Sequence, residues 1–172
     1  MTTLMEPLAD AGTDAPRLLP RPPAARLVDH LARLGSPPSS GRELIGEVER
    51  AGLRGRGGAG FPTAIKMEAV RSRGARVLQG RKPIVVANGT EGEPLSAKDK
   101  TLLVHAPHLV LDGMVAAAHA VGADEAIVGV ERTAVPVVHA LERAIEERRG
   151  HRDGITLRVA STPARYVVGE ET

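Results

Sequence analysis

Cysteine and tryptophan are absent from this chain of 172 residues, and phenylalanine and tyrosine occur once each. Without cysteine, the chain can form no disulfide, no cysteine-ligated zinc site and no cysteine-ligated iron–sulfur cluster. Arginine raises the isoelectric point to about 9.4, but the net charge is only +2. So small an excess does not imply a nucleic-acid partner, and we expect none.

Long hydrophobic runs are also missing. The longest apolar stretch, 109–121, is interrupted by Asp112 and Gly113 and is too short to span a membrane. The first residues carry acidic side chains where a secretory signal would have an apolar segment. These features predict a cytoplasmic protein without direct membrane insertion, which would reach a membrane only peripherally, through its partners.

The chain divides into two parts. Residues 1–23 are rich in Pro and Ala and lack periodicity, which predicts a disordered tail, and 24–172 form one α/β domain. Apolar periodicity and breaker residues predict helices at 24–34, 40–50, 63–73, 98–104, 109–121 and 135–149. Short β-branched runs predict strands at 84–87, 126–130 and 155–160. This alternation indicates a layered, Rossmann-like fold with a mostly parallel sheet. We expect 84–87 and 126–130 to be its most buried strands.

A glycine-rich loop is the most informative feature of the sequence. Residues 54–63, RGRGGAGFPT, place four glycines in six residues just before Pro62 and Thr63, which fit the start of a helix. Free amides and the positive end of the helix dipole would then meet at one point. Arg56 and Lys66 add positive charge nearby. The pattern predicts a site for a phosphate, a carboxylate or an electron-rich ring.

Other kinds of glycine loop fit less well. The G-x-G-x-x-G spacing is present, but a helical pattern precedes it and no acidic residue follows about 20 positions later, as a dinucleotide fold requires. No P-loop sequence occurs. An RNA-binding RGG segment would be repeated, and this one is single. A glycine-rich surface turn remains the plain alternative.

Two further motifs follow the glycine loop. Residues 85–94, VVANGTEGEP, form an apolar strand that enters an acidic loop, and 165–172, RYVVGEET, end the chain. Both follow predicted strands, and the carboxyl ends of parallel strands meet at one edge of a sheet. The only Phe and the only Tyr of the chain fall in the first and third motifs, where packing is the alternative role for Tyr166.

The acidic side chains of these motifs allow two interpretations. The clustered glutamates could accept hydrogen bonds from ligand amides and hydroxyls, or they could bind a hard cation, which Lys66 would oppose. His105 and His108 form an H-x-x-H pair, which fits helix entry better than metal binding. We expect no metal site.

The three motifs together resemble a known family, over roughly 44–172. The NADH-binding flavin subunit of respiratory complex I, with its relatives in NAD-linked hydrogenases and formate dehydrogenases, carries G-L-R-G-R-G-G-A-G-F-P-T-G-x-K-W, then N-A-D-E-x-E-P, then Y-x-x-G-E-E. The resemblance implies hydride transfer from NADH to FMN and electron transfer to iron–sulfur partners. The implied flavin-binding residues are Gly55, Gly57, Gly58, Lys66, Asn88, Glu91, Tyr166, Gly169, Glu170 and Glu171. Phe61, Lys66 and Glu93 would bind NADH.

The chain departs from the family pattern at several points. Thr90 stands where the family has Asp, Ala64 where it has Gly, and Met67 where it has Trp. The family continues past the third motif into the rest of its flavin domain and a [4Fe–4S] domain, so we expect a domain that is incomplete at its C-terminus. We therefore expect the isolated chain to bind FMN weakly or not at all. The alternative is a non-catalytic remnant or an anion-binding module that keeps the fold.

Overall fold

The computed structural model describes residues 18–19, 23–37, 41–55, 59–77, 82–91, 95–150 and 154–163, with only the backbone of 74–77. Its helices are α1 (Leu27–Leu34), α2 (Glu43–Arg50), α3 (Thr63–Val77), α4 (Lys98–His105), α5 (Pro107–Val121) and α6 (Val135–Glu147). Its strands are β1 (Ile84–Asn88), β2 (Glu125–Glu131) and β3 (Thr156–Thr162). Nearly all of the predicted tail and the third motif lie outside the described residues.

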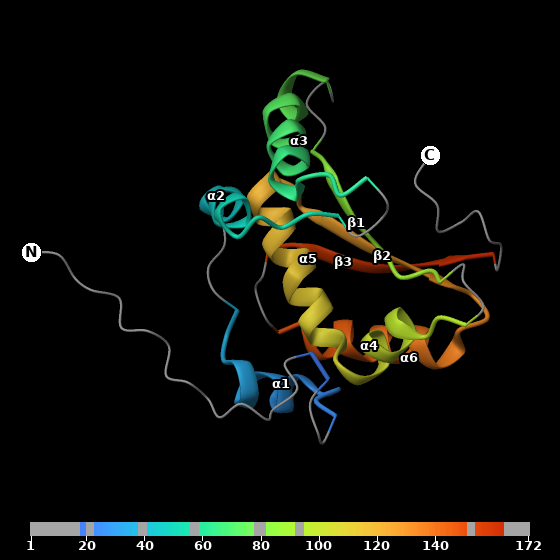
Figure 1. Ribbon diagram of the computed structural model, residues 1–172. Helices are drawn as coiled ribbons and strands as arrows, with labels where there is room; N and C mark the ends of the chain where they lie inside the picture. The colour runs from blue at the N-terminus through green and yellow to red at the C-terminus, as the bar shows by residue number, and fades with distance from the viewer. Residues whose placement is uncertain are drawn as a thin grey trace, which may run out of the picture.

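The three strands form a parallel sheet in the order β1-β2-β3, with every strand next to its neighbour in the sequence. The connection from β1 to β2 runs through α4 and α5, and the connection from β2 to β3 runs through α6 (Figure 1). Parallel neighbours need such crossovers, because a tight turn cannot return the chain to the same end of the sheet. The predicted layered α/β class with a parallel sheet is confirmed.

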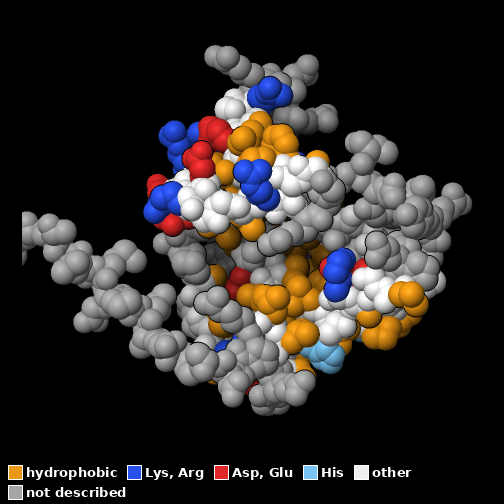
Figure 2. All heavy atoms as spheres, in the orientation of Figure 1, with side chains coloured by type: hydrophobic (Ala, Val, Ile, Leu, Met, Phe, Trp, Pro, Cys, Tyr) orange, Lys and Arg blue, Asp and Glu red, His pale blue; other side chains and the backbone are white. Residues whose placement is uncertain are grey.

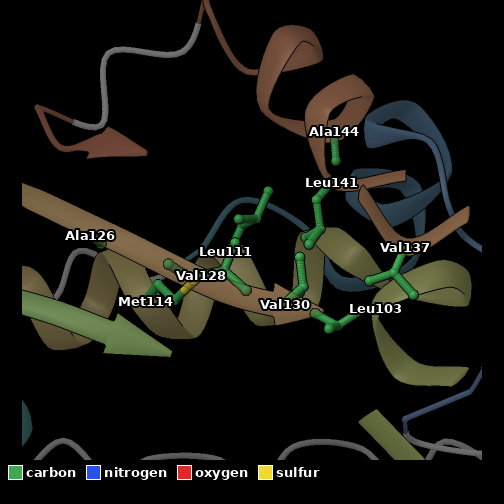
Figure 3. Packing of buried hydrophobic residues seen from close by; sticks show 9 residues of the cluster. All are labelled: Leu103, Leu111, Met114, Ala126, Val128, Val130, Val137, Leu141 and Ala144. Carbon is green, nitrogen blue, oxygen red and sulfur yellow. The ribbon is translucent and has the colours of Figure 1, made fainter. Parts of the chain in front are cut away.

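The core lies between the sheet and these crossover helices. Val128 and Val130 of β2 are at most 1% exposed and pack against Leu111 of α5 and Leu141 of α6, which are both fully buried. Figure 3 shows these side chains directed toward one another from the strand and from the helices. Leu103 of α4 closes the cluster. Aliphatic side chains and the thioether of Met114 therefore fill the main core, in keeping with the scarcity of aromatics in the chain.

Strand β1 corrects the expectation of a fully buried strand at 84–87. Val85 and Ala87 pack against the core, but Ile84 is 52% exposed and Val86 is 66% exposed. The reason is position: β1 is an edge strand, and among the described residues the crossover helices pack on one face of the sheet. The central strand β2 alone matches the expected burial, with a strict alternation that buries every second side chain.

Helices α2 and α3 form a smaller satellite of the core. Ile45 of α2 and Ala64 of α3 pack against Ala120 near the end of α5. Met67 of α3 contacts both this group and a neighbouring cluster that includes Val85 of β1. The helix that follows the glycine loop is thus anchored to the last turns of α5 and through them to the sheet.

Helix α1 is held to α5 and α6 by a buried network of ionisable side chains. Nε2 of His30 lies 2.7 Å from Oδ2 of Asp112, and Arg148 bonds the other oxygen of that carboxylate. Nε of Arg148 also donates to Nδ1 of His108 at 3.1 Å, which leaves the Nε2–H of His108 to face Glu147 at 3.2 Å. Burial, and then the charge of Arg148, lowers the pKa of His108.

The start of α5 differs from the prediction. Helix α5 begins at Pro107 and not at residue 109, because a proline fits the first turn, and this places His108 inside the helix. Among the described residues no single helix is long and apolar enough to cross a membrane, while α4 and α5 pass that test only as a pair bent by 96°.

Candidate functional site

The glycine loop closes into a hairpin that leads directly into α3. Arg54 and Pro62 form an antiparallel bridge, and the amide of Gly55 donates to the carbonyl of Phe61 at 2.9 Å. Gly60 has a φ of +54°, a backbone conformation that suits glycine, and its carbonyl accepts from the Arg54 guanidinium at 3.3 Å. The hairpin therefore fixes where the loop starts and ends, and α3 begins at Thr63 as predicted.

The hairpin brings two predicted site residues together. Phe61 is 45% exposed, although it is the only Phe of the chain, and Nζ of Lys66 lies 5.8 Å from the centroid of its ring. An ammonium at this distance is attracted to the ring face. An exposed aromatic ring beside a positive charge can stack on a planar group and attract an anion at the same time.

The end of β1 presents the second motif. Asn88, the last residue of the strand, is exposed, and its Oδ1 accepts from the amide of Thr90 at 3.1 Å and from Oγ1 of Thr90 at 2.6 Å. The threonine that replaces the family's aspartate thus closes a tight turn with Asn88. Gly89 sits inside this turn, and its amide continues the ladder to the carbonyl of Gly129 on β2 at 2.8 Å.

Glu91 lies in a different environment from Asn88, because it is only 7% exposed. Its Oε1 accepts from Oγ of Ser96 at 2.7 Å and from the amide of Asp99 at 3.0 Å, and Oε2 accepts from the amide of Lys100 at 3.4 Å. Burial would raise the pKa of Glu91, but these hydrogen bonds outweigh it, so that its pKa is lowered. Among the described residues, the hydrogen-bond partners of this carboxylate are groups of the protein itself.

One charged pair at the same edge of the sheet was not among the predicted site residues. Nζ of Lys100 on α4 lies 3.7 Å from Oε2 of Glu131, the last residue of β2. Glu131 ends β2 two positions beyond Gly129, the register partner of Asn88. Its place at the carboxyl end of a predicted strand was the sequence signal that could have identified it.

The H-x-x-H pair is split between two helices. His105 ends α4 and is exposed, whereas His108 is fully buried in α5 and bonded to Arg148 and Glu147. The described residues hold no group of three or more His, Asp or Glu side chains that could bind a metal ion.

Several predicted site residues lie outside the described residues. They are Gly57, Gly58, Glu93, Tyr166, Gly169, Glu170 and Glu171. That the glycine hairpin and the loop after β1 face each other across one cleft stays a prediction.

A separate groove of about 620 Å³ runs between α2 and α3. Ile45, Ala64 and Ala69 contribute apolar lining, and Arg42 and Glu49 are among its charged residues. Figure 2 shows basic and acidic side chains gathered over these two helices. None of the predicted flavin or NADH residues lines this groove, so it is distinct from the candidate site.

Comparison with known proteins decides the family. The pattern of the Nuo51 FMN-binding domain matches residues 48–172, which include all three motifs. The chain belongs to this family. The suspected resemblance is thereby confirmed, and FMN is the cofactor for which the Nuo51 domain is named.

Relatives that share this domain are longer proteins. The F subunit of NADH-quinone oxidoreductase in Streptomyces coelicolor is 34% identical over 140 residues, which are 76% of this chain and 30% of the relative. An F subunit of the same oxidoreductase in Rhizobium meliloti is 36% identical over 138 residues, which are 75% and 31% of the two proteins.

The fold has solved counterparts as well. A crystal structure of an NAD+-reducing [NiFe]-hydrogenase in the H2-reduced state superposes with a TM-score of 0.61 at 36% identity, over 76% of this chain and 22% of that one. The chain therefore spans about a third or less of the length of the proteins it matches.

Proposed function

We propose that residues 24–172 form the FMN- and NADH-binding part of an NADH dehydrogenase-type oxidoreductase, which acts in the cytoplasm with iron–sulfur partners. Membership of the Nuo51 family supports the cofactor, and the NADH-quinone oxidoreductase relatives from two bacteria support the reaction class. The observation that carries the proposal in this chain is the exposed Phe61 ring beside Lys66, directly after the glycine hairpin.

The described residues fit a flavin nucleotide by the chemistry of their donors and acceptors. A planar ring system with a phosphate tail needs an aromatic or apolar surface, a positive charge and amide or hydroxyl partners. Lys66 offers the positive charge, with the Phe61 ring beside it, and Asn88 with Thr90 offers an exposed amide next to a half-buried hydroxyl. FMN, when bound, supplies a ring that accepts a hydride from NADH and releases electrons singly.

The protein's own residues would bind and orient the two nucleotides. Phe61 would stack on a base of NADH, and Lys66 would hold an anionic group of either nucleotide with a charge-assisted hydrogen bond. Asn88 would bind the flavin from the end of β1. We propose Gly55, Gly57 and Gly58 for the backbone contacts, with Glu93, Tyr166, Gly169, Glu170 and Glu171 as further ligands, as the motif matches imply.

A second function is favoured by one observation. The chain spans 30% of the Streptomyces coelicolor relative, so that the glycine hairpin could serve as an anion-binding module without catalysis. An assay of NADH oxidation separates the two functions, with the remaining two thirds of a relative supplied as a second polypeptide. An oxidoreductase should then oxidise NADH, whereas a binding module should not.

The direct test is a titration of the chain with FMN, followed by flavin fluorescence. We expect weak binding or none, far from the nanomolar range of about −12 kcal/mol, because these 172 residues span only about a third of the length of the relatives. Lys66→Met should weaken binding by about 1.5–3 kcal/mol, the range for a charge-assisted hydrogen bond. Lys82→Met, which removes an exposed lysine paired with Asp124, is the matched control. Equal FMN affinity of wild type and Lys66→Met would contradict the proposal.

A further inference from the structure

We infer that Glu91 is a positioning residue, which fastens the flavin-side loop after β1 to α4 and does not itself contact the cofactor. This inference rests on the proposed function, because it names how the chain holds one wall of the same site. It departs from the role that the motif match implies, in which Glu91 binds the flavin directly.

The first argument is that α4 lacks a cap of its own. Its N-cap residue is Ala97, which has no side chain that can accept a hydrogen bond. The first helical bond is donated by the amide of Thr101 to the carbonyl of Ala97, so the amides before it need other partners. Glu91 supplies two of these partners, since its two oxygens accept from the amides of Asp99 and Lys100.

The second argument is that the carboxylate is committed on both oxygens. The hydroxyl of Ser96 donates to Oε1 in addition to the Asp99 amide, and the residue is 7% exposed. A negative charge at this position is also favoured by the positive end of the α4 dipole. Three of the roughly four acceptor positions of this carboxylate are thus used within the protein, and its low exposure leaves little surface for a ligand.

The third argument is that the loop before Glu91 has little freedom left. Gly89 donates to Gly129 on β2, and a Cβ added at Gly89 would lie 2.8 Å from Cδ1 of Leu103 and 3.0 Å from the carbonyl oxygen of Gly129. Glu91 bonds to α4, which carries Leu103 into the core. The loop is thus held at both ends of the segment 89–91, between β2 and α4. The exposed side chain of Asn88 and the half-buried Thr90 are held for the ligand by this fixed segment.

The test uses the whole isotope-labelled chain and FMN itself as the probe, with amide chemical shifts as the measure of binding up to millimolar concentrations. Glu91→Gln should weaken FMN binding about tenfold, the size expected for losing a hydrogen-bonding charge. It should also accelerate hydrogen exchange at the amides of Asp99 and Lys100. Ser96→Ala, which leaves Glu91 in place, should act in the same direction on both readouts. Glu142→Gln, at an exposed glutamate of α6, is the matched control.

A rescue variant separates the loop anchor from the stability of the helix. Adding Ala97→Asp to Glu91→Gln gives α4 a local cap, which should restore slow exchange at Asp99 and Lys100 but not the affinity for FMN. If both readouts recover, the loop anchor plays no part in binding and the inference is wrong.

Two further outcomes are decisive. If Glu91→Gln weakens FMN binding while Ser96→Ala does not, and the two amides exchange as in wild type, then Glu91 is a direct ligand and the inference fails alone. If wild type shows no FMN-dependent shifts at any concentration, this chain presents no flavin-binding loop by itself, and the inference that Glu91 positions such a loop fails.

Discussion

On the helix side of the sheet, Val128 and Val130 are at most 1% exposed, whereas on the opposite side Val86 is 66% exposed and Ile84 is 52% exposed. Both groups are β-branched or aliphatic and both belong to regular parallel strands. The difference comes from the layer above each face: α4, α5 and α6 contribute to the core on one face, and no described helix lies on the other (Figure 1).

Parallel sheets are normally covered on both faces. In this chain the buried apolar contacts that stabilise the described fold are therefore concentrated on one side of the sheet. The same kind of substitution should therefore change the free energy of unfolding by very different amounts on the two faces, and variants can measure that contrast.

The largest contrast should come from the covered face. Leu141→Ala removes a fully buried side chain of α6 from the main cluster, and we expect a loss of about 2–5 kcal/mol in the free energy of unfolding. Denaturant unfolding followed by circular dichroism measures it. A loss below about 1 kcal/mol would mean that the core relaxes into the space and that the covered face is not the main source of stability.

The second prediction concerns the network of ionisable side chains that joins α1 to α5 and α6. Arg148→Met removes the guanidinium that bonds both Asp112 and His108, and we expect a loss of about 2–3 kcal/mol. This lies below the value for a fully buried pair, because the Asp112 side chain is 18% exposed and keeps its bond to His30. Arg149→Met is the matched control, since Arg149 is an exposed neighbour with a surface ion pair. Similar losses in both variants would show that the network adds nothing specific.

Stability at mildly acidic pH tests the same network. The pKa of His108 is lowered by burial and then by Arg148, so the unfolded chain binds a proton at a higher pH than the native chain does. The contribution of neutral His108 is fully present above the ordinary pKa of about 6.5, decreases as the pH falls below it by at most about 1.4 kcal/mol per pH unit, and is lost once the pH has fallen through the lowered native pKa.

Unfolding free energies between about pH 7.5 and 5.5, on either side of the ordinary histidine pKa, measure this effect. His108→Gln should reduce the slope of the unfolding free energy against pH relative to wild type. His139→Gln, at an exposed histidine of α6, is the matched control and should leave that slope unchanged. Parallel slopes for wild type and His108→Gln would show that His108 does not cause the pH dependence.

The smallest effect belongs to the open face. Val86→Thr keeps a β-branched side chain, and at 66% exposure the change should alter the free energy of unfolding by no more than about 0.5 kcal/mol. Val128→Thr, at an equally regular strand position that is 1% exposed, is the partner substitution and should cost clearly more. Equal effects would show that the open face is covered in solution.

Much of the fold could be predicted from the sequence because its signals are local. Helix α3 begins at Thr63, directly after a proline, and α4 begins at Lys98, both as predicted, since proline and apolar spacing act within one or two turns. The strands at 84–87, 126–130 and 155–160 were found within two residues of their bounds, and alternation with helices sufficed for a parallel sheet. The glycine loop that leads into α3 was likewise predicted from neighbouring residues, whereas the Arg54–Pro62 bridge that closes it was not.

The tertiary structure decided what depends on contacts between distant segments. The exposure of Val86 follows from which face α5 and α6 cover, and the burial of His108 follows from Arg148, 40 residues further along the chain. The partners of Glu91 belong to α4, so that its sequence motif predicts a ligand while its surroundings make it a cap. Sequence determines local geometry because its causes lie within a few residues, whereas burial, protonation and hydrogen-bond partners depend on how those local pieces pack.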